Sequence, residues 1–240
     1  LDPNCNVQFG EGGAGTFSDG KLTTRIGDPR CRGVLKMLHS LGAPEDILTS
    51  AKPHIGTDIL RRVVENAAER LTELGGEIRY HTALTELPMR SGEVGRIMTD
   101  GGEIECGAVV LAVGHSARDT YSMIMRRGYE VVPKAFSMGL RIEHLREDID
   151  RSLYGDDAGH PLLPPAEYAM SRHYGERTAY TFCMCPGGEV VAASSEEGLL
   201  AVNGMSRYAR DGRNSNSAVL VSIAASDTPD GQIELQRRYE

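Results

Sequence analysis

The sequence predicts an α/β fold, with a first part rich in helices around a parallel strand and a second, mostly antiparallel β layer. The central strand is residues 108–113, Ala-Val-Val-Leu-Ala-Val, an unbroken apolar run that Gly114 ends. Such runs are typical of parallel strands buried on both faces. After Val131 the apolar residues change from helical spacing to short alternations. We therefore expect two domains, residues 1–130 and 131–240.

The first domain also contains two expected amphipathic helices and a β-meander. Apolar residues recur at helical spacing in Arg30–Leu41 and Thr57–Leu74, and a glycine follows each segment. The turns Ser91-Gly92 and Asp100-Gly101 then divide a series of short polar–apolar alternations. These alternations predict strands in Glu77–His81, Ala83–Pro88, Glu93–Thr99 and Gly102–Glu105. A further helix is expected from near Ser116 to Gly128.

The second domain is expected to consist mainly of strands. The candidates are Phe136–Ile142, Glu167–His173, Arg177–Met184, Glu189–Ala193 and Ala218–Ile223. Pro161, Pro164 and Pro165 mark a loop between the first two of these strands. Gln232–Glu240 has the pattern of a helix that is just beginning, so we expect the chain to be a fragment of a longer protein.

The composition limits the kinds of partner that the chain is expected to bind. There are 26 Lys and Arg against 34 Asp and Glu, a net charge of -8, and no dense basic stripe, which argues against nucleic acid. No apolar segment approaches the roughly 20 residues of a membrane span, and no secretion leader opens the chain. Five cysteines at irregular spacing favour reduced thiols. We expect a cytoplasmic protein that acts on a small molecule; its oligomeric state stays open.

A glycine-rich loop is the first stretch with recognisable chemistry. Gly10, Gly12 and Gly15 match the letters G-x-G-x-x-G, but no buried strand precedes them and turn residues follow them. The exposed amides of such a loop can form an anion-binding concavity, helped by the hydroxyls of Thr16 and Ser18 and the charge of Lys21. A flexible surface loop is the alternative interpretation.

Four motifs in order resemble a known family. They are Asn6–Leu22, Val110–Ala117, Phe182–Gly188, and Asn203–Ser206 with Ala209–Gly212 and Asn214–Ser217. Together they resemble an uncharacterised bacterial family of NAD(FAD)-utilizing dehydrogenases within the glutathione-reductase-like flavoproteins. The resemblance implies an FAD-dependent oxidoreductase that transfers a hydride between flavin and an organic substrate, with NAD(P)H as an optional electron donor. A flavin monooxygenase and a non-catalytic protein with structural FAD remain alternatives.

The resemblance also implies an incomplete Rossmann-like FAD/NAD(P)-binding domain followed by a substrate domain. In the family the true G-x-G-x-x-G segment would precede Leu1, and a last flavin segment would follow Glu240. This chain alone is therefore expected to bind FAD weakly and to be inactive. The expected cofactor-binding residues are Gly12, Gly13, Ala14, Gly15, Thr16, Ser18, Lys21, Ala83, Leu84, Ala112, Val113 and Gly114, of which Ala83 and Leu84 rest on the resemblance alone.

Two cysteines are candidate catalytic residues. Cys183 and Cys185 lie two apart on a predicted strand, so their side chains share a face. Their Cα atoms would be about 6.6 Å apart, near the upper limit for a disulfide. Packing of small apolar thiols is the alternative role. No metal site is predicted, because no histidine or further cysteine accompanies the pair at zinc-ligand spacing.

The remaining candidates are polar. His115 follows the predicted central strand, where an imidazole that titrates near neutrality would lie beside a cofactor, and it is the third candidate catalytic residue. A structural histidine is the alternative. Arg210, Asn214 and Asn216 form a polar cluster suited to an anionic or polar substrate group, or else a solvated loop.

Overall fold

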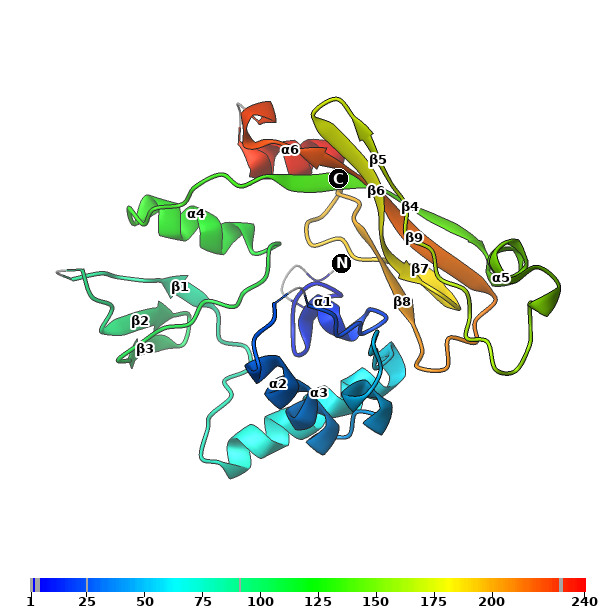
Figure 1. The fold of residues 1–240 in the computed structure, drawn as a ribbon. Coiled ribbons are helices and arrows are strands. Elements are labelled where there is room, and N and C mark those ends of the chain that lie inside the picture. Colours follow the sequence, from blue (N-terminus) through cyan, green and yellow to red (C-terminus); the bar gives the residue numbers. More distant parts are fainter. Residues whose placement is uncertain (1, 3–4, 25, 91, 229–230) are drawn as a thin grey trace.

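The computed structural model describes residues 2, 5–24, 26–90, 92–228 and 231–240. Its α-helices are α1 (Gly13–Thr16), α2 (Arg30–Ser40), α3 (Thr57–Glu73), α4 (Arg118–Arg126), α5 (Arg146–Tyr154) and α6 (Gln232–Tyr239). Its strands are β1 (Leu84–Glu86), β2 (Arg96–Thr99), β3 (Gly102–Glu105), β4 (Phe136–Leu145), β5 (Ser171–Tyr174), β6 (Arg177–Cys185), β7 (Gly188–Ala192), β8 (Val202–Ser206) and β9 (Asn214–Ile223). Short 3₁₀ turns cover Glu45–Leu48, Gly155–Asp157 and Ala225–Asp227. Figure 1 shows their arrangement.

The second half of the chain is built on a four-stranded sheet with the order β4-β9-β6-β5. Each neighbouring pair in it is antiparallel, which confirms the mostly antiparallel character expected for this half. Strands β4 and β9 pair without interruption from Phe136↔Ile223 to Leu145↔Asn214. The β6–β9 register shifts between Phe182 and Cys185, a bulge that bends β6 near its end. Strands β7 and β8 form a separate antiparallel pair beside this sheet (Figure 1).

Helices α2 and α3 hold the first hydrophobic core. Their predicted segments are confirmed, since each helix ends one residue before the predicted limit. Buried Ala43, Ile47, Ile55 and Val63 form the centre of this core. The partly buried residues packed against them are Leu22, Leu38, Leu41, Leu48, Ile59 and Leu60. The apolar stripe of each helix therefore faces this shared core, as is typical of amphipathic helices.

The meander is confirmed as a three-stranded antiparallel sheet, β1-β2-β3. The first predicted strand, Glu77–His81, is wrong, because these residues form no strand. Glu77 and Arg79 instead pair with each other through side chains on the surface. Ser91, half of one predicted turn, lies outside the described residues. Helix α4 confirms the helix expected after Ser116.

The predicted central strand is the main correction to the fold. Residues 108–113 form no strand, and their side chains are largely exposed, with Val110 89% accessible. The physical reason is pairing: a parallel strand needs neighbours for its N–H and C=O groups, and every named strand pair in the described chain is antiparallel. The Rossmann-like part of the predicted fold therefore stays a prediction. Among the described residues, no helix has the length and apolar character to cross a membrane.

Candidate functional site

The glycine-rich segment folds back onto strands from the other end of the chain. Ser18 fixes the turn after α1, because its hydroxyl donates to the Gly15 carbonyl at 2.6 Å and accepts from the Gly20 amide at 3.0 Å. Farther on, the Asn203 amide group of β8 donates to the Phe17 carbonyl at 2.9 Å. These contacts hold the side chain of Asp19, which is fully buried, against the second half of the chain.

Asp19 is the centre of an ion network. Its carboxylate lies 2.8 Å from Lys21 Nζ, and Arg210 reaches it through Nε at 3.0 Å and Nη2 at 2.5 Å. The Ser206 hydroxyl donates to the same carboxylate. Burial alone would raise the pKa of Asp19, but the hydrogen bond from Arg210 and the charges of Lys21 and Arg210 outweigh it and lower the pKa to about 2. Asp19 is therefore a buried carboxylate that stays ionised.

Cys183 and Cys185 lie next to this network, at the bulge of β6. Cys183 has φ +47°, so its side chain no longer follows the regular alternation of the strand. The Cys185 thiol donates to the Cys183 carbonyl oxygen at 3.4 Å, and it also interacts with the Cys183 sulfur. Lys21 Nζ donates to the Met184 carbonyl between them. The two thiols and one ammonium group thus share a single small volume.

The two thiols have opposite acidities. The hydrogen bond from Cys185, opposed by burial but aided by the charges of Lys21 and Arg141, lowers the pKa of Cys183 to about 6. The same hydrogen bond, together with burial, raises the pKa of Cys185. These opposite shifts favour a thiolate on Cys183 and a thiol on Cys185, which is the arrangement of a nucleophile beside a proton donor.

Arg141 connects this thiol pair to β9. Its Nη1 atom donates to the Cys183 carbonyl at 3.3 Å and to Asn216 Oδ1, and it lies 4.0 Å from Cys185 Sγ. A Cβ at Gly204 of β8 would overlap both Arg141 and Asn216, so the β8 backbone closes directly over them. Asn216 is fully buried, and its Nδ2 atom has no hydrogen-bond partner among the described residues.

The structure gathers five of the predicted site residues. Lys21, Cys183, Cys185, Arg210 and Asn216 all belong to the connected cluster around Asp19 and Arg141. Asn214 is apart from it, because its amide group donates to Glu143 Oε1 at 2.7 Å on the surface. Arg210 is already occupied by two carboxylates, since its Nη1 atom lies 2.8 Å from Glu167. This pairing leaves it better suited to positioning than to binding an anion.

His115 lies outside this cluster. Its side chain is exposed, and its Nδ1 atom lies 3.1 Å from the Ser116 hydroxyl. The residues that sequence reasoning missed are Asp19 and Arg141. Asp19 could have been found from the sequence, because it lies in the motif Phe17-Ser18-Asp19-Gly20-Lys21. Arg141 is a single charged residue in an alternating strand, and nothing in the sequence marks it as a site residue.

The predicted cofactor-binding residues have mixed surroundings. Nothing lies within 4 Å of a Cβ position at Gly15 or Gly114, so backbone there is open to a ligand. The buried Thr16 hydroxyl has no partner among the described residues, which leaves it free for one. The Ala83 amide and carbonyl, by contrast, are both engaged by Asp100, at 2.9 and 3.1 Å. Lys21 is held by Asp19 and Met184.

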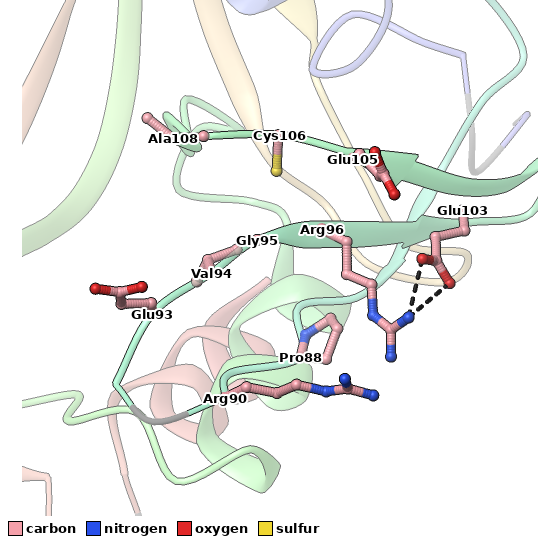
Figure 2. A pocket seen from close by; sticks show the side chains of 11 residues that line it. Pro88, Arg90, Glu93, Val94, Gly95, Arg96, Glu103, Glu105, Cys106 and Ala108 are labelled. Atoms are coloured by element: carbon pink, nitrogen blue, oxygen red, sulfur yellow. Dashed lines mark hydrogen bonds and ion pairs between the residues drawn. The ribbon is translucent and has the colours of Figure 1, made fainter.

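Two hollows lie elsewhere on the described chain. A cavity of about 720 Å³ opens on the meander, where Arg96 pairs with Glu103 at 2.9 Å and Cys106 lies nearby (Figure 2). A second cavity of about 690 Å³ lies between α3 and the segment that follows it. None of the predicted site residues lines either cavity. Polar contacts and burial, rather than hollow size, therefore mark the candidate site.

Comparison with known proteins supports the flavin interpretation. Residues 135–240 match the family model described as "FAD-dependent protein, C-terminal domain-like". A protein of Clostridium beijerinckii, named only "Uncharacterized protein", is 48% identical over 246 residues. That alignment covers all of this chain and 46% of the relative, so the chain spans about half the length of the relative. The matched region contains Cys183, Cys185, Arg210 and Asn216, and it is similar to a domain of FAD-dependent proteins.

Proposed function

We propose that this chain is part of an FAD-dependent oxidoreductase that transfers a hydride between bound flavin and an organic substrate. The observation that carries the proposal is the match of residues 135–240 to a family named for FAD dependence. In this proposal residues 1–130 contribute to the FAD-binding domain and residues 131–240 form the substrate domain. The flavin, when bound, supplies the hydride chemistry, and the protein supplies orientation and electrostatics.

The described residues fit such a group in part. Gly15 and Gly114 leave backbone open to a flat ligand, and the buried Thr16 hydroxyl lacks a protein partner among the described residues. The other proposed cofactor contacts are Gly12, Gly13, Ala14, Ser18, Lys21, Ala83, Leu84, Ala112 and Val113. The engaged backbone of Ala83 makes it and Leu84 the weakest members of this set.

The buried cluster would serve the substrate. Cys183 would hold a negative charge near neutrality, and Cys185 would hold a proton beside it. Asn216 would offer its unpartnered amide group to a polar substrate atom, while Asp19 fixes Lys21 and Arg210 in place. Asn214 would lie at the edge of this substrate site. His115 would act from outside the cluster, as an exposed polar group at the surface.

Substitution of Gly15 tests whether the glycine segment touches FAD. Gly15→Val adds a side chain where nothing lies within 4 Å and where φ is not positive, so the fold should tolerate it. A ligand that approaches this backbone would be displaced, and we expect at least a tenfold lower flavin content in the purified complete gene product. Gly27→Val is the matched control, because its surroundings are equally open. Equal flavin content in both variants would remove Gly15 from the site.

Anaerobic reduction of the same preparation tests the reaction class. Bleaching of the flavin absorbance by an organic metabolite or by a reduced nicotinamide would support an oxidoreductase. A flavin that is reduced but turns over substrate only with oxygen would instead indicate a monooxygenase. A bound flavin that no reductant bleaches would indicate a structural cofactor and would contradict the proposal.

A further inference from the structure

The thiol pair has a chemical asymmetry that packing alone does not require. One sulfur, on Cys183, is half-buried and lies near two cationic groups, Lys21 and Arg141. The other, on Cys185, is completely buried, directs its thiol at Cys183, and packs against Arg141. Two apolar small residues would fill the same space without this arrangement.

The backbone at the pair is also unusual. Cys183 takes a left-handed conformation, which costs a non-glycine residue energy, and it does so at the register shift between Phe182 and Cys185. The shift interrupts regular pairing with β9, so the two cysteines are not held as ordinary members of the ladder. Bulges of this kind commonly re-aim a side chain next to a reactive site.

We propose that Cys183 and Cys185 form a redox-active dithiol, in which Cys183 attacks a small organic disulfide and Cys185 completes the exchange. In the first step the Cys183 thiolate forms a bond to one sulfur of the disulfide, and the other half leaves as a thiolate. In the second step Cys185 loses its proton to the departing thiolate and attacks the Cys183 sulfur, so that the mixed disulfide bond breaks and the second half of the substrate leaves as a thiolate. The protein disulfide forms, the substrate disulfide is reduced to one thiol and one thiolate that takes its proton from water, and two electrons pass from protein to substrate.

The surrounding charges suit this sequence. Lys21 and Arg141 stabilise the attacking thiolate, and Asp19 keeps Lys21 in place without contacting the sulfurs in any described hydrogen bond. The low acidity of Cys185 keeps it protonated until Cys183 has reacted, so the order of attack is set by the site. The proposal requires no flavin, so it can fail or hold independently of the function proposed above.

The probe for the test is 5,5′-dithiobis(2-nitrobenzoate), an aromatic disulfide whose released thiolate is coloured. The other three cysteines, Cys5, Cys31 and Cys106, are first replaced by serine. We expect the remaining pair to release two coloured thiolates, leaving a protein lighter by two hydrogens with no adduct. Dithiothreitol should reverse the change. Stable adducts on both cysteines, or no release from the folded protein, would overturn the proposal.

Single variants separate the two roles. Cys185→Ser should release one coloured thiolate and keep a mixed disulfide on Cys183, whereas Cys183→Ser should react at least tenfold more slowly, because Cys185 is buried and protonated. If Cys183→Ser does not fold, peptide mass mapping of the parent after brief labelling gives the same information. Initial modification at Cys185 rather than Cys183 would contradict the assigned order.

The pH dependence provides a second, independent readout. The rate of the first step should have its midpoint near pH 6, far below the roughly 8.5 of an ordinary thiol. Lys21→Met should move this midpoint upward, and Lys36→Met, on the exposed surface of α2, should not. A midpoint at the ordinary thiol value in the parent, or equal midpoints in both lysine variants, would count against the cationic environment assigned to Cys183.

Discussion

Asp19 illustrates how one residue can join distant parts of a sequence. Its cationic partners, Lys21 and Arg210, come from the two ends of the chain. Since folding lowers the pKa of Asp19 from 3.8 to about 2, its ionised form stabilises the fold above pH 4, and this stabilisation is lost as pH falls through 2. A shift of this size corresponds to about 2 kcal/mol.

Asp19→Asn should therefore destabilise the protein at neutral pH by about 3 kcal/mol, because Lys21 loses its buried counter-charge while Arg210 keeps Glu167. The difference from the parent should shrink between pH 4 and pH 2. Urea unfolding at pH 7, 4 and 2.5 measures both effects, with Glu189→Gln on the exposed face of β7 as the control. A difference that is constant over this pH range would contradict the role of the charge.

Among the elements, the long pairing of β4 with β9 depends on Gly139. A Cβ at this position would overlap the Val219 carbonyl and the Leu220 Cα atom, both of which are backbone and cannot move without disturbing the ladder. We expect Gly139→Ala to lower the free energy of unfolding by about 1–3 kcal/mol. Gly33→Ala, in an open position of α2, should instead raise it by about 0.5–1 kcal/mol. Denaturant midpoints of the two variants should shift in opposite directions, and shifts of the same sign would refute this interpretation.

The elements also show where sequence reasoning succeeds. Helices α2 and α3 were predictable because each turns one apolar stripe toward a shared core, and β4, β6 and β9 because their alternation matches a half-buried sheet. Strand β8 was missed, since its Asn203-Gly204 step has turn composition. Helix α5 was missed, since most of its residues are polar or charged, among them the surface pairs Arg146–Asp150 and Arg151–Glu147. Residues 108–113 were mistaken for a strand because an unbroken apolar run indicates that residues can be buried, but it does not show whether a neighbouring strand exists to pair with them.

The candidate site likewise has a part that the sequence predicts and a part that it does not. Sequence motifs contained Lys21, Cys183, Cys185, Arg210 and Asn216, which the fold brings together. The contacts among them were not predictable, because Lys21 reaches Met184 across 163 positions and Arg210 reaches Asp19 across 191. Local patterns carry no information about such pairings. His115 was placed by the predicted central strand, and with that strand absent it is an exposed turn residue.

At the scale of the whole molecule, Arg118 connects the first half of the chain to its last helix. Its side chain, 3% exposed, extends from α4 to Glu196 at 2.8 Å and to Glu240, just after α6, at 2.7 Å. A weaker contact of 3.4 Å reaches Gln236 within α6. Burial alone would lower the pKa of Arg118, but its hydrogen bonds to the two carboxylates outweigh this effect and raise the pKa. Figure 1 shows α4 and α6 otherwise on separate parts of the fold.

Arg118→Ala should therefore uncouple the two helices. Two partly buried carboxylates would lose their shared cation, which should lower the free energy of unfolding by about 3 kcal/mol. Helix α6 should then detach from α4 before the β4–β9 ladder opens. Hydrogen exchange should then become at least tenfold faster in α4 and α6, while the amides of β9 change less. Arg126→Ala, an exposed position on the same helix, is the matched control.

Arg118→Lys should restore only part of the protection, because an ammonium group cannot reproduce the planar fork that contacts both carboxylates at once. Full protection of α6 in Arg118→Ala would show that its packing, rather than this ion pair, holds the helix in place.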